Sequence, residues 1–291
     1  MTEGEQNAGG EYHLDALTPP PHRAYSRTMT DSSARAAGVL SKFRLDGKTA
    51  VVTGATRGIG RALARALAEA GGNIVIVGRD EAAAREVEAE LSELGTQTLI
   101  VMAEITERSE VERLLAATLE RFGRADILVN NAGTCIHCPA LDVTDDEWRQ
   151  VMSVNVDALW IASQVFGRQM VAQGGGNIVN IGSISAQIVN RPQWQPGYNA
   201  SKAAVHQLTK SLAAEWAPHN VRVNALAPGY VKTDMAPVDD PQFKQRWIDD
   251  APQQRAALPE ELGPAVVFLA SEASSFMTGS VLVMDGGYTL F

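Results

Sequence analysis

The chain has 291 residues, with 25 Lys and Arg against 34 Asp and Glu, a formal net charge of −9 and a pI of about 5.1. An acidic chain lacks the basic face that nucleic-acid binding requires, and no run of about 18 apolar residues could form a membrane-spanning helix. The two cysteines, Cys135 and Cys138, are too few for a disulfide scaffold and are typical of a reducing compartment. We therefore expect a cytoplasmic protein that binds neither nucleic acid nor membrane.

Residues 1–44 differ in composition from the rest of the chain. They contain three consecutive prolines at 19–21, two adjacent glycines at 9–10 and scattered polar residues without a sustained hydrophobic period. This composition is typical of a tail and not of a core segment. No apolar stretch resembles a secretory leader, and the four acids in the first 15 residues are unlike a transit peptide. The sequence predicts an N-terminal tail over 1–44, either flexible or packed as an arm on a neighbouring subunit, and one domain over 45–291.

From residue 45 onward, short apolar segments alternate with Ala- and Leu-rich segments of helical spacing. The apolar segments predict strands at 49–53, 74–77, 98–102, 127–129, 177–181, 221–226 and 281–284, and the intervening segments predict helices at 61–70, 81–94, 109–121, 198–216 and around 148–171. Alternation of strand and helix implies right-handed crossovers and a parallel sheet. Strands that are apolar throughout fit a sheet covered on both faces. The predicted fold class is α/β, a single Rossmann-type domain with a doubly wound, parallel, seven-stranded sheet.

The turn between the first strand and the first helix contains Gly54, Gly58 and Gly60. Gly54 permits a tight turn, Gly58 lets the backbone approach a pyrophosphate, and Gly60 permits close packing of helix on strand. The helix then offers free N–H groups and a positive dipole end to phosphate. Glycine-rich turns also occur as purely structural connections, but the position after the first strand indicates dinucleotide binding. The segment expected to hold the cofactor consists of Gly54, Thr56, Arg57, Gly58, Ile59 and Gly60.

The end of the second strand indicates which nicotinamide cofactor is preferred. An acidic residue there binds the ribose 2′-hydroxyl of NAD, whereas a nearby arginine accommodates a 2′-phosphate. Gly78 stands where the acid is expected, and Arg79 follows it, with Arg57 in the glycine turn. Two guanidinium groups can make charge-assisted bonds to one phosphate. The sequence therefore favours NADP over NAD, although Asp80 lies close by and both arginines could be ordinary surface residues.

Tyr198 and Lys202 have the i, i+4 spacing that places two side chains on one face of a helix. An unperturbed tyrosine, with a pKa of about 10, is a poor base at neutral pH, and a lysine ammonium one turn away favours its phenolate. A surface tyrosine beside a surface lysine would give the same pattern. Other polar residues strengthen the catalytic interpretation: three sets follow predicted strands at the edge where open α/β sheets hold their ligands, and one is an amide in an apolar helix, where it needs a partner. They are Ser183, the segment Asn130–Gly133, Asn155 in an otherwise apolar helix, and the segment Pro228–Thr233.

These segments together, in this order, resemble the short-chain dehydrogenase/reductase family from about residue 43 to 291. The resemblance implies that Tyr198 is the general acid/base, that Ser183 binds the substrate oxygen, and that Lys202 lowers the pKa of Tyr198 and holds the nicotinamide ribose. It implies that Asn155 orients a water in a proton relay. It also implies further cofactor contacts by Arg79, Glu104, Ile105, Asn131, Ala132, Gly133, Tyr198, Lys202, Pro228, Gly229, Val231 and Thr233. Glu104 departs from the Asp or Asn usual at the adenine contact.

The identity of the catalytic serine has one alternative. Many family members place it about 13 residues before the tyrosine, and Ser185 has that spacing, whereas Ser183 is 15 residues before Tyr198. We favour Ser183, because it directly follows the end of the fifth predicted strand.

The segment after Ser183 is expected to shape the substrate pocket, with Ser183, Gln187, Asn190 and Tyr198 as substrate-binding residues and Trp194 as a wall. Its pattern is similar to family members that act on sugar alcohols and ketoses. A polyol/ketose pair is therefore the favoured substrate. Reduction of a 3-oxoacyl thioester, steroid or aromatic ketone is the alternative, and a non-catalytic NADP sensor is a remote one. The resemblance also implies a homotetramer, with the surplus apolar residues of helix 198–216 covered by another subunit.

Cys135 and Cys138 have a spacing that invites a zinc or dithiol interpretation. No second ligand pair accompanies them. We expect no metal site and interpret the two cysteines as lining near the pocket rim.

Overall fold

Seven strands form one sheet in the order β3-β2-β1-β4-β5-β6-β7, and every neighbouring pair is parallel. The computed structural model describes residues 38–234 and 236–291. The strands are β1 (Thr49–Thr53), β2 (Asn73–Gly78), β3 (Thr98–Met102), β4 (Ile127–Asn130), β5 (Gly176–Ile181), β6 (Val221–Pro228) and β7 (Val281–Met284). The predicted fold class, a doubly wound, parallel, seven-stranded sheet, is confirmed.

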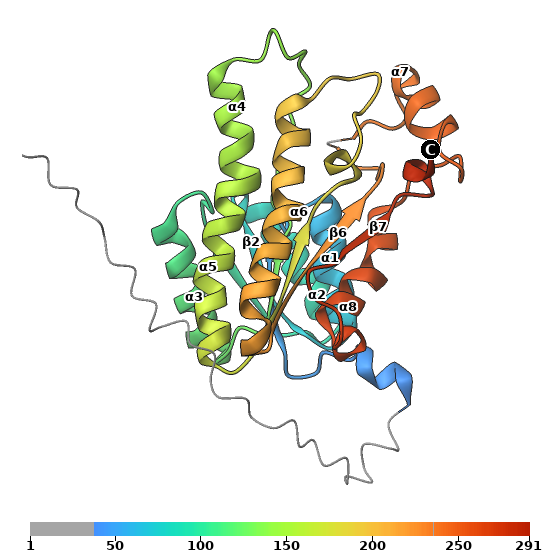
Figure 1. Cartoon of the computed structure of the whole chain (residues 1–291). Helices are drawn as coiled ribbons and strands as arrows, with labels where there is room; N and C mark the ends of the chain where they lie inside the picture. The colour runs from blue at the N-terminus through green and yellow to red at the C-terminus, as the bar shows by residue number, and fades with distance from the viewer. Residues whose placement is uncertain (1–37, 235) are drawn as a thin grey trace, which may run out of the picture. The chain divides into compact units, whose positions relative to one another are not determined.

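Helices cover both faces of this sheet (Figure 1). One face packs against α1 (Gly58–Glu69), α2 (Glu81–Glu93) and α8 (Gly263–Ala270), and the other against α3 (Arg108–Phe122), α5 (Ala158–Ala172) and α6 (Pro196–Trp216). The alternation of side chains along each strand supplies both cores. In β1, for example, Ala50 and Val52 join the first cluster and Val51 joins the second. Burial on both sides explains why the strands are apolar throughout.

The predicted helical region around 148–171 is more complex than a single helix. It consists of α4 (Asp145–Met152), a π-helical segment Ser153–Asp157 and α5. Together they run as one rod in Figure 1. Single π turns inside α-helices are rare and frequently lie at functional sites. This one contains the buried side chain of Asn155.

Two further elements were not anticipated from the sequence, namely α8 and the short α7 (Pro241–Lys244), which continues into a π-helical turn, Gln245–Asp249. The segment of α8, Gly-Pro-Ala-Val-Val-Phe-Leu-Ala, is uniformly apolar, so it has no helical period to read. Its position over the sheet, packed on α1, decides its structure.

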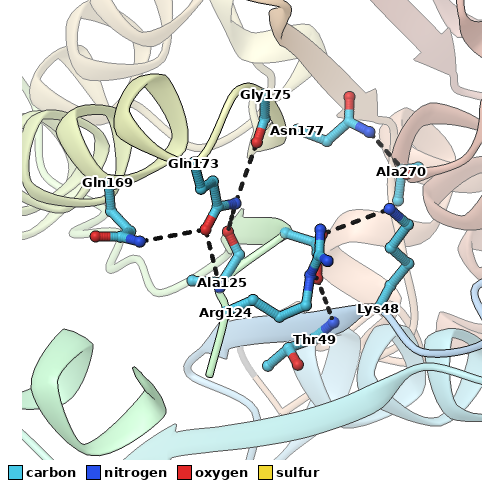
Figure 2. A network of polar contacts seen from close by, with 10 residues as sticks. Lys48, Thr49, Arg124, Ala125, Gln169, Gln173, Gly175, Asn177 and Ala270 are labelled. Carbon is cyan, nitrogen blue, oxygen red and sulfur yellow. Dashed lines mark hydrogen bonds and ion pairs between the residues drawn. The ribbon is translucent and has the colours of Figure 1, made fainter. Parts of the chain in front are cut away.

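At the amino ends of the strands, the buried side chain of Asp126 binds several neighbouring groups. Its carboxylate accepts bonds from the Thr49 backbone N–H (3.0 Å) and the Arg124 guanidinium (2.6 Å from Nε), and it lies 3.5 Å from Lys48 Nζ. Figure 2 shows Arg124, Lys48 and Thr49 converging there. Side-chain bonds from Gln173 to Ala125 and Gly175 continue the network toward β5. This network joins β1 to β4.

The predicted tail over 1–44 lies outside the described residues up to position 37. The remainder holds a 3₁₀ turn, Val39–Phe43, and the first core side chain is Leu45, at 2% exposure. In the parts of the chain that the structure describes, no helix combines the length and apolarity needed to cross a membrane.

Candidate active site

The candidate site lies at the carboxyl ends of the strands, where the order reverses between β1 and β4. In open α/β sheets this reversal opens a crevice for ligands. The glycine turn follows β1 and the Asn130–Gly133 segment begins at the end of β4. Ser183 follows β5, and Gly229–Thr233 follows β6. The fold therefore brings all the predicted motif segments to one edge.

In the glycine turn, packing excludes a side chain at Gly60, and backbone conformation disfavours one at Gly58. A Cβ atom on Gly60 would lie 2.0 Å from the carbonyl oxygen of Gly54, and Gly58 has φ +51°, a conformation that favours glycine. A Cβ atom on Gly58 would lie 3.5 Å from Thr233 Cγ2. The Asn131 side chain donates to the carbonyls of Thr53 (2.9 Å) and Gly54 (3.1 Å). Asn131 thus holds the turn in place through its side-chain amide.

At the end of β2, Gly78 packs against the glycine turn, because a Cβ at this position would lie 2.5 Å from Thr56 Cγ2. Arg79 and Arg57 are exposed beside it. Arg79 Nη1 donates to Glu104 Oε2 at 3.2 Å. Partial burial opposes ionisation of Glu104, but the bonds from Thr106 and the ion pair with Arg79 outweigh it and lower the pKa of Glu104. Glu104, which was expected to lie near the adenine, therefore binds Arg79, which was expected to lie near the 2′-phosphate.

Tyr198 and Lys202 lie in the first two turns of α6, as predicted. Lys202 Nζ is 5.6 Å from the centre of the Tyr198 ring and donates to the carbonyl of Ile181, the last residue of β5, at 2.7 Å. Burial lowers the pKa of Lys202 to about 8. Burial also raises the pKa of Tyr198 above its usual range, and a hydrogen bond with Ser183 opposes that shift. In the protein alone, the Tyr198 shift thus has the opposite direction to the one that Lys202 was expected to cause.

Asn155 is brought next to this pair by the π-helical segment. Its Oδ1 accepts from the Thr134 N–H (2.8 Å), and its Nδ2 donates to the Thr134 carbonyl (2.9 Å) and to Ser201 Oγ (3.0 Å). A Cβ on Gly133 would lie 3.2 Å from Asn155 Oδ1 and 3.8 Å from Lys202 Nζ. Asn155 and Lys202 therefore flank the same glycine.

Ser183 and Ser185 are both buried and hydrogen-bonded to each other. Ser183 Oγ lies 3.0 Å from Ser185 Oγ and accepts from the Ser185 N–H at 3.1 Å. Of the two hydroxyls, that of Ser183 lowers the pKa of Tyr198 and therefore faces it.

The predicted substrate loop divides into exposed and buried members. Gln187 is exposed, and Trp194 is 53% exposed. Asn190 is 3% exposed, and its amide binds protein groups at both ends: Nδ2 donates to the Tyr230 hydroxyl (3.0 Å) and Oδ1 accepts from Gln195 Nε2 (3.1 Å). Asn190 thus links the loop to the segment after β6.

Sequence reasoning missed an aromatic stack beside this loop. The Trp247 ring stacks on Phe243 (4.1 Å between centres) and on Tyr230 (4.6 Å), and Tyr288 meets Tyr230 edge-on at 5.2 Å. Trp247 Nε1 donates to Gln193 Oε1 at 2.9 Å. The members come from three distant segments, so no local period could reveal them. A faint signal was the pair of glutamines, Gln193 and Gln195, just before Tyr198.

The remaining predicted cofactor residues lie around the same edge. Pro228 ends β6, the Gly229 N–H donates to the Met284 carbonyl (2.9 Å), and Val231 is buried and paired with Ala257. Ala132 N–H donates to Thr53 Oγ1 at 3.1 Å. Ile59, Ile105, Ala132, Gly133 and Thr233 are partly exposed.

The two cysteines are free and partly buried. Burial raises the pKa of the Cys135 thiol to about 12, and its Sγ donates to Gln195 Oε1 at 3.5 Å. A protonated thiol is a poor metal ligand and a poor nucleophile. Across residues 38–234 and 236–291, no group of three or more His, Cys, Asp or Glu is arranged to hold a metal ion.

Comparison with known proteins adds to this geometry. A family model described as Enoyl-(Acyl carrier protein) reductase matches residues 54–289. Galactitol 2-dehydrogenase (L-tagatose-forming) of Cereibacter sphaeroides is 48% identical over 252 residues, 86% of this chain and 98% of that protein. The crystal structure of a short-chain type dehydrogenase/reductase from Mycobacterium marinum is 40% identical, with a TM-score of 0.84 over 87% of this chain and 99% of that one. A gluconate 5-dehydrogenase from Burkholderia cenocepacia J2315 in complex with NADP and tartrate is 38% identical, with a TM-score of 0.83 over 87% and 100%.

Proposed function

The chain belongs to the short-chain dehydrogenase/reductase family and is an NAD(P)-dependent alcohol dehydrogenase/reductase; from this premise we propose that it interconverts a sugar alcohol and its ketose. The observation that carries the proposal is the convergence of Tyr198, Lys202 and Ser183 at the end of β5. The 48% identity to a galactitol 2-dehydrogenase supports the substrate class.

In this proposal Tyr198 is the general acid/base. During ketose reduction its hydroxyl delivers a proton to the substrate oxygen, and during alcohol oxidation its phenolate removes that proton. Ser183 donates to the same oxygen and stabilises the charge that develops there. Both groups act on one atom, in agreement with the effect of the Ser183 hydroxyl on the pKa of Tyr198.

Lys202 is proposed to supply a positive charge beside Tyr198, and Lys202 and Asn155 are proposed to form the path for protons between Tyr198 and solvent. With its pKa lowered to about 8 by burial, Lys202 is mostly protonated at neutral pH and can stabilise the phenolate of Tyr198 electrostatically. Asn155 is proposed to orient a water beside Lys202, because the two side chains flank Gly133. A proton taken up at Tyr198 can then leave through Lys202 toward solvent.

The residues at the β1–β4 crevice fit a nicotinamide dinucleotide. The turn before α1 contains Gly54 and Gly58, which have positive φ angles, and Gly60, which has no room for a Cβ; the free N–H groups of α1 suit a pyrophosphate. When bound, the cofactor donates or accepts the hydride. The residues proposed to hold it are Gly54, Thr56, Arg57, Gly58, Ile59, Gly60, Arg79, Glu104, Ile105, Asn131, Ala132, Gly133, Tyr198, Lys202, Pro228, Gly229, Val231 and Thr233.

We propose NADP as the preferred cofactor. Position 78 has no carboxylate to bind a ribose 2′-hydroxyl, and two exposed guanidinium groups, Arg57 and Arg79, lie near it. The test is binding of NADPH and NADH to the Arg79→Asp variant. We expect weaker NADPH binding and a gain in NADH binding; unchanged NADPH affinity would contradict the assignment.

The substrate is proposed to contact Ser183, Gln187, Asn190 and Tyr198. Asn190 donates one Nδ2 proton to Tyr230 and retains a second, and Gln187 is exposed. Hydroxyl-rich substrates match such amide groups, which both donate and accept. A thioester carried on an acyl carrier protein is the competing substrate; the net charge of −9 does not favour docking of another acidic protein.

We also propose that the protein forms a homotetramer and lies in the cytoplasm. A homotetramer would cover the outer side of α6, where Ala203 is exposed and Leu208 partly so, and Trp160 on α5, which is 37% exposed. Light scattering of the purified protein measures this state. A cytoplasmic location agrees with two unpaired thiols and is tested by cell fractionation.

The experiment that tests the function is oxidation of a polyol panel with NADP⁺ and with NAD⁺, read by the absorbance of the reduced cofactor. The panel includes threitol, erythritol, arabinitol, xylitol, mannitol and galactitol, with the matching ketoses in the reverse direction. Turnover of one or two members, lost in Tyr198→Phe, supports the proposal. No turnover in either direction, together with reduction of a 3-oxoacyl thioester or hydrophobic ketone, would replace the substrate assignment.

A further inference from the structure

Gln195 is a buried side chain to which neither the sequence motifs nor the proposed mechanism assigns a task. It is 6% exposed and immediately precedes α6, three residues before Tyr198. Its side chain makes no capping bond to the helix. The simplest structural explanation for a polar residue at this position, satisfaction of free helix N–H groups, therefore does not apply.

The amide of Gln195 instead binds side chains of the active-site wall. Nε2 lies 3.1 Å from Asn190 Oδ1, 3.1 Å from Asn199 Oδ1 and 3.4 Å from Ser185 Oγ. Oε1 accepts from Cys135 Sγ (3.5 Å) and from Gln193 Nε2 (3.4 Å). One amide group carries two protons, so its three acceptors compete for them. Gln195 is thus a hub on which several hydrogen bonds depend.

The contact between Gln195 and Ser185 connects Gln195 with Ser183, whose hydroxyl is proposed to bind the substrate oxygen. A hydroxyl has one proton and can accept two bonds. If Gln195 donates to Ser185 Oγ, the proton of Ser185 is free to point to Ser183 Oγ, 3.0 Å away. Ser183, which also accepts from the Ser185 N–H, can then direct its own proton to the substrate oxygen.

We propose that Gln195 is a positioning residue that sets the direction of this donor chain, from Gln195 through Ser185 and Ser183 to the substrate oxygen. The Ser183 and Ser185 hydroxyl oxygens lie 3.0 Å apart, and either can donate to the other, so the donor chain requires the orientation in which Ser185 donates to Ser183. The inference rests on the proposed role of Ser183. It assigns Ser185 a task other than that of catalytic serine.

The same hub connects the serine pair to the aromatic stack. Gln193 donates to Gln195 and accepts from Trp247 Nε1, and Asn190 joins Gln195 to the Tyr230 hydroxyl. Two hydrogen-bonded routes thus run from the stack to Gln195. The two routes end at Trp247 and Tyr230, which both lie in the segment that follows β6. The position of that segment is therefore linked to the hydroxyl orientations of Ser183 and Ser185.

The test uses Gln195→Glu, which keeps the shape of the side chain and replaces the donor by an acceptor. In this variant the Ser185 hydroxyl proton turns to the carboxylate, and Ser183 loses the bond from that hydroxyl while it keeps the one from the Ser185 N–H. We expect kcat for ketone reduction to fall about fivefold, the worth of one ordinary hydrogen bond, with KM changed less than about twofold. The matched control is Gln207→Glu, the same change at an exposed position of α6, which should retain wild-type kcat.

A double-mutant cycle with Ser185→Ala separates this role from general disturbance of the loop. If Gln195 acts through Ser185, adding Gln195→Glu to Ser185→Ala lowers kcat by less than about twofold further. An equal fivefold loss in both backgrounds would overturn the proposal, as would an unchanged kcat in Gln195→Glu alone.

The cycle is also measured on the unfolding temperature without cofactor or substrate. We expect non-additive shifts for Gln195→Glu and Ser185→Ala, and additive shifts for Gln207→Glu and Ser185→Ala; additivity in the first pair would overturn the proposal independently of turnover. If the wild-type chain reduces a ketone that is not a ketose, the proposed substrate fails while the kinetic cycle can still be run on that ketone. The two failures are therefore distinguishable.

Discussion

Gly78 and Thr56 are in such close contact that a Cβ atom at position 78 would lie 2.5 Å from Thr56 Cγ2. This relationship connects two segments that sequence inspection treats separately, the glycine turn after β1 and the end of β2. The position at which an acidic residue would select NAD is closed by a methyl group of the neighbouring turn. We therefore expect cofactor preference to depend on both residues, because each restricts the side chain that the other position can hold.

A first prediction concerns this pair. Gly78→Asp alone should lower the unfolding temperature and use both cofactors poorly, because the new side chain meets Thr56. Adding Thr56→Ser removes the methyl group, and we expect kcat/KM with NAD to rise at least about tenfold over the single variant, as one good hydrogen bond to the ribose predicts. Steady-state kinetics with both cofactors measure this. Equal NAD use by the single and double variants would show that Thr56 does not restrict the position.

Loss of the Tyr198 hydroxyl should abolish most turnover without unfolding the protein. In Tyr198→Phe the ring remains packed beside Lys202, but no group delivers the proton. We expect kcat to fall about 10³-fold, within the usual range for a general acid/base. NADPH binding, followed by fluorescence, should stay within about twofold of wild type. A variant that retains a tenth of the wild-type rate would exclude Tyr198 as the proton donor.

The hydrogen bond between Trp247 and Gln193 is predicted to affect substrate binding more than chemistry. Trp247→Phe keeps an aromatic ring against Phe243 and Tyr230 and removes the 2.9 Å bond from Nε1. We expect KM to rise about fivefold, since the partly buried acceptor Gln193 Oε1 loses this bond, with kcat within about twofold. Trp247→Ala, which also removes the stacking, should raise KM further. A fall in kcat at constant KM in Trp247→Phe would contradict a role in binding.

Asp126 is predicted to matter for stability and not for activity. It is 5% exposed and accepts bonds from Arg124 and the Thr49 N–H at the edge of the sheet away from the site (Figure 2). Asp126→Ala leaves these donors without their acceptor, which should cost about 1–3 kcal/mol of unfolding free energy. Denaturant unfolding measures the loss, and kcat at low temperature should remain unchanged. A stability equal to wild type would show that water replaces the carboxylate fully.

We expect His206 to reduce the free energy of unfolding at acidic pH. Burial, with the charges of Lys202 and Lys210, lowers the pKa of His206 from 6.5 to about 4, and its buried Nε2 has no hydrogen-bond partner among residues 38–234 and 236–291. Between pH 6.5 and 4 the unfolded chain therefore binds a proton that the folded chain does not, so stability falls as the pH falls through this window. His206→Gln removes this contribution.

The measurement is unfolding free energy against pH for both proteins. We expect the wild type to lose about 2 kcal/mol more than His206→Gln between pH 6.5 and 4. Parallel curves would indicate that His206 titrates normally in the folded protein.

Much of the fold could be predicted from local pattern. The apolar, β-branched runs located all seven strands, with β1, β3 and β7 matching the predicted bounds, because strands buried on both faces carry their signal in every residue. The spacing of Tyr198 and Lys202 also needed only helix geometry. By contrast, α8 was missed, since a uniformly apolar octapeptide has no period, and the π turn at Asn155 has no known local signal.

The sequence by itself predicted the order in which the motif segments follow the strands, the glycine turn and the pairing of Tyr198 with Lys202 on one helix face, because these depend on residues within one turn or one strand of each other. Only the tertiary structure decided which serine hydroxyl lowers the pKa of Tyr198, which side chain closes position 78, and how Gln195 joins Ser185 to the aromatic stack. These contacts join loops at the ends of different strands, and their partners are set by how the sheet aligns those ends in space. Tyr230 and Trp247, for example, are ring neighbours although 17 positions apart in the chain, a relationship that no local spacing encodes.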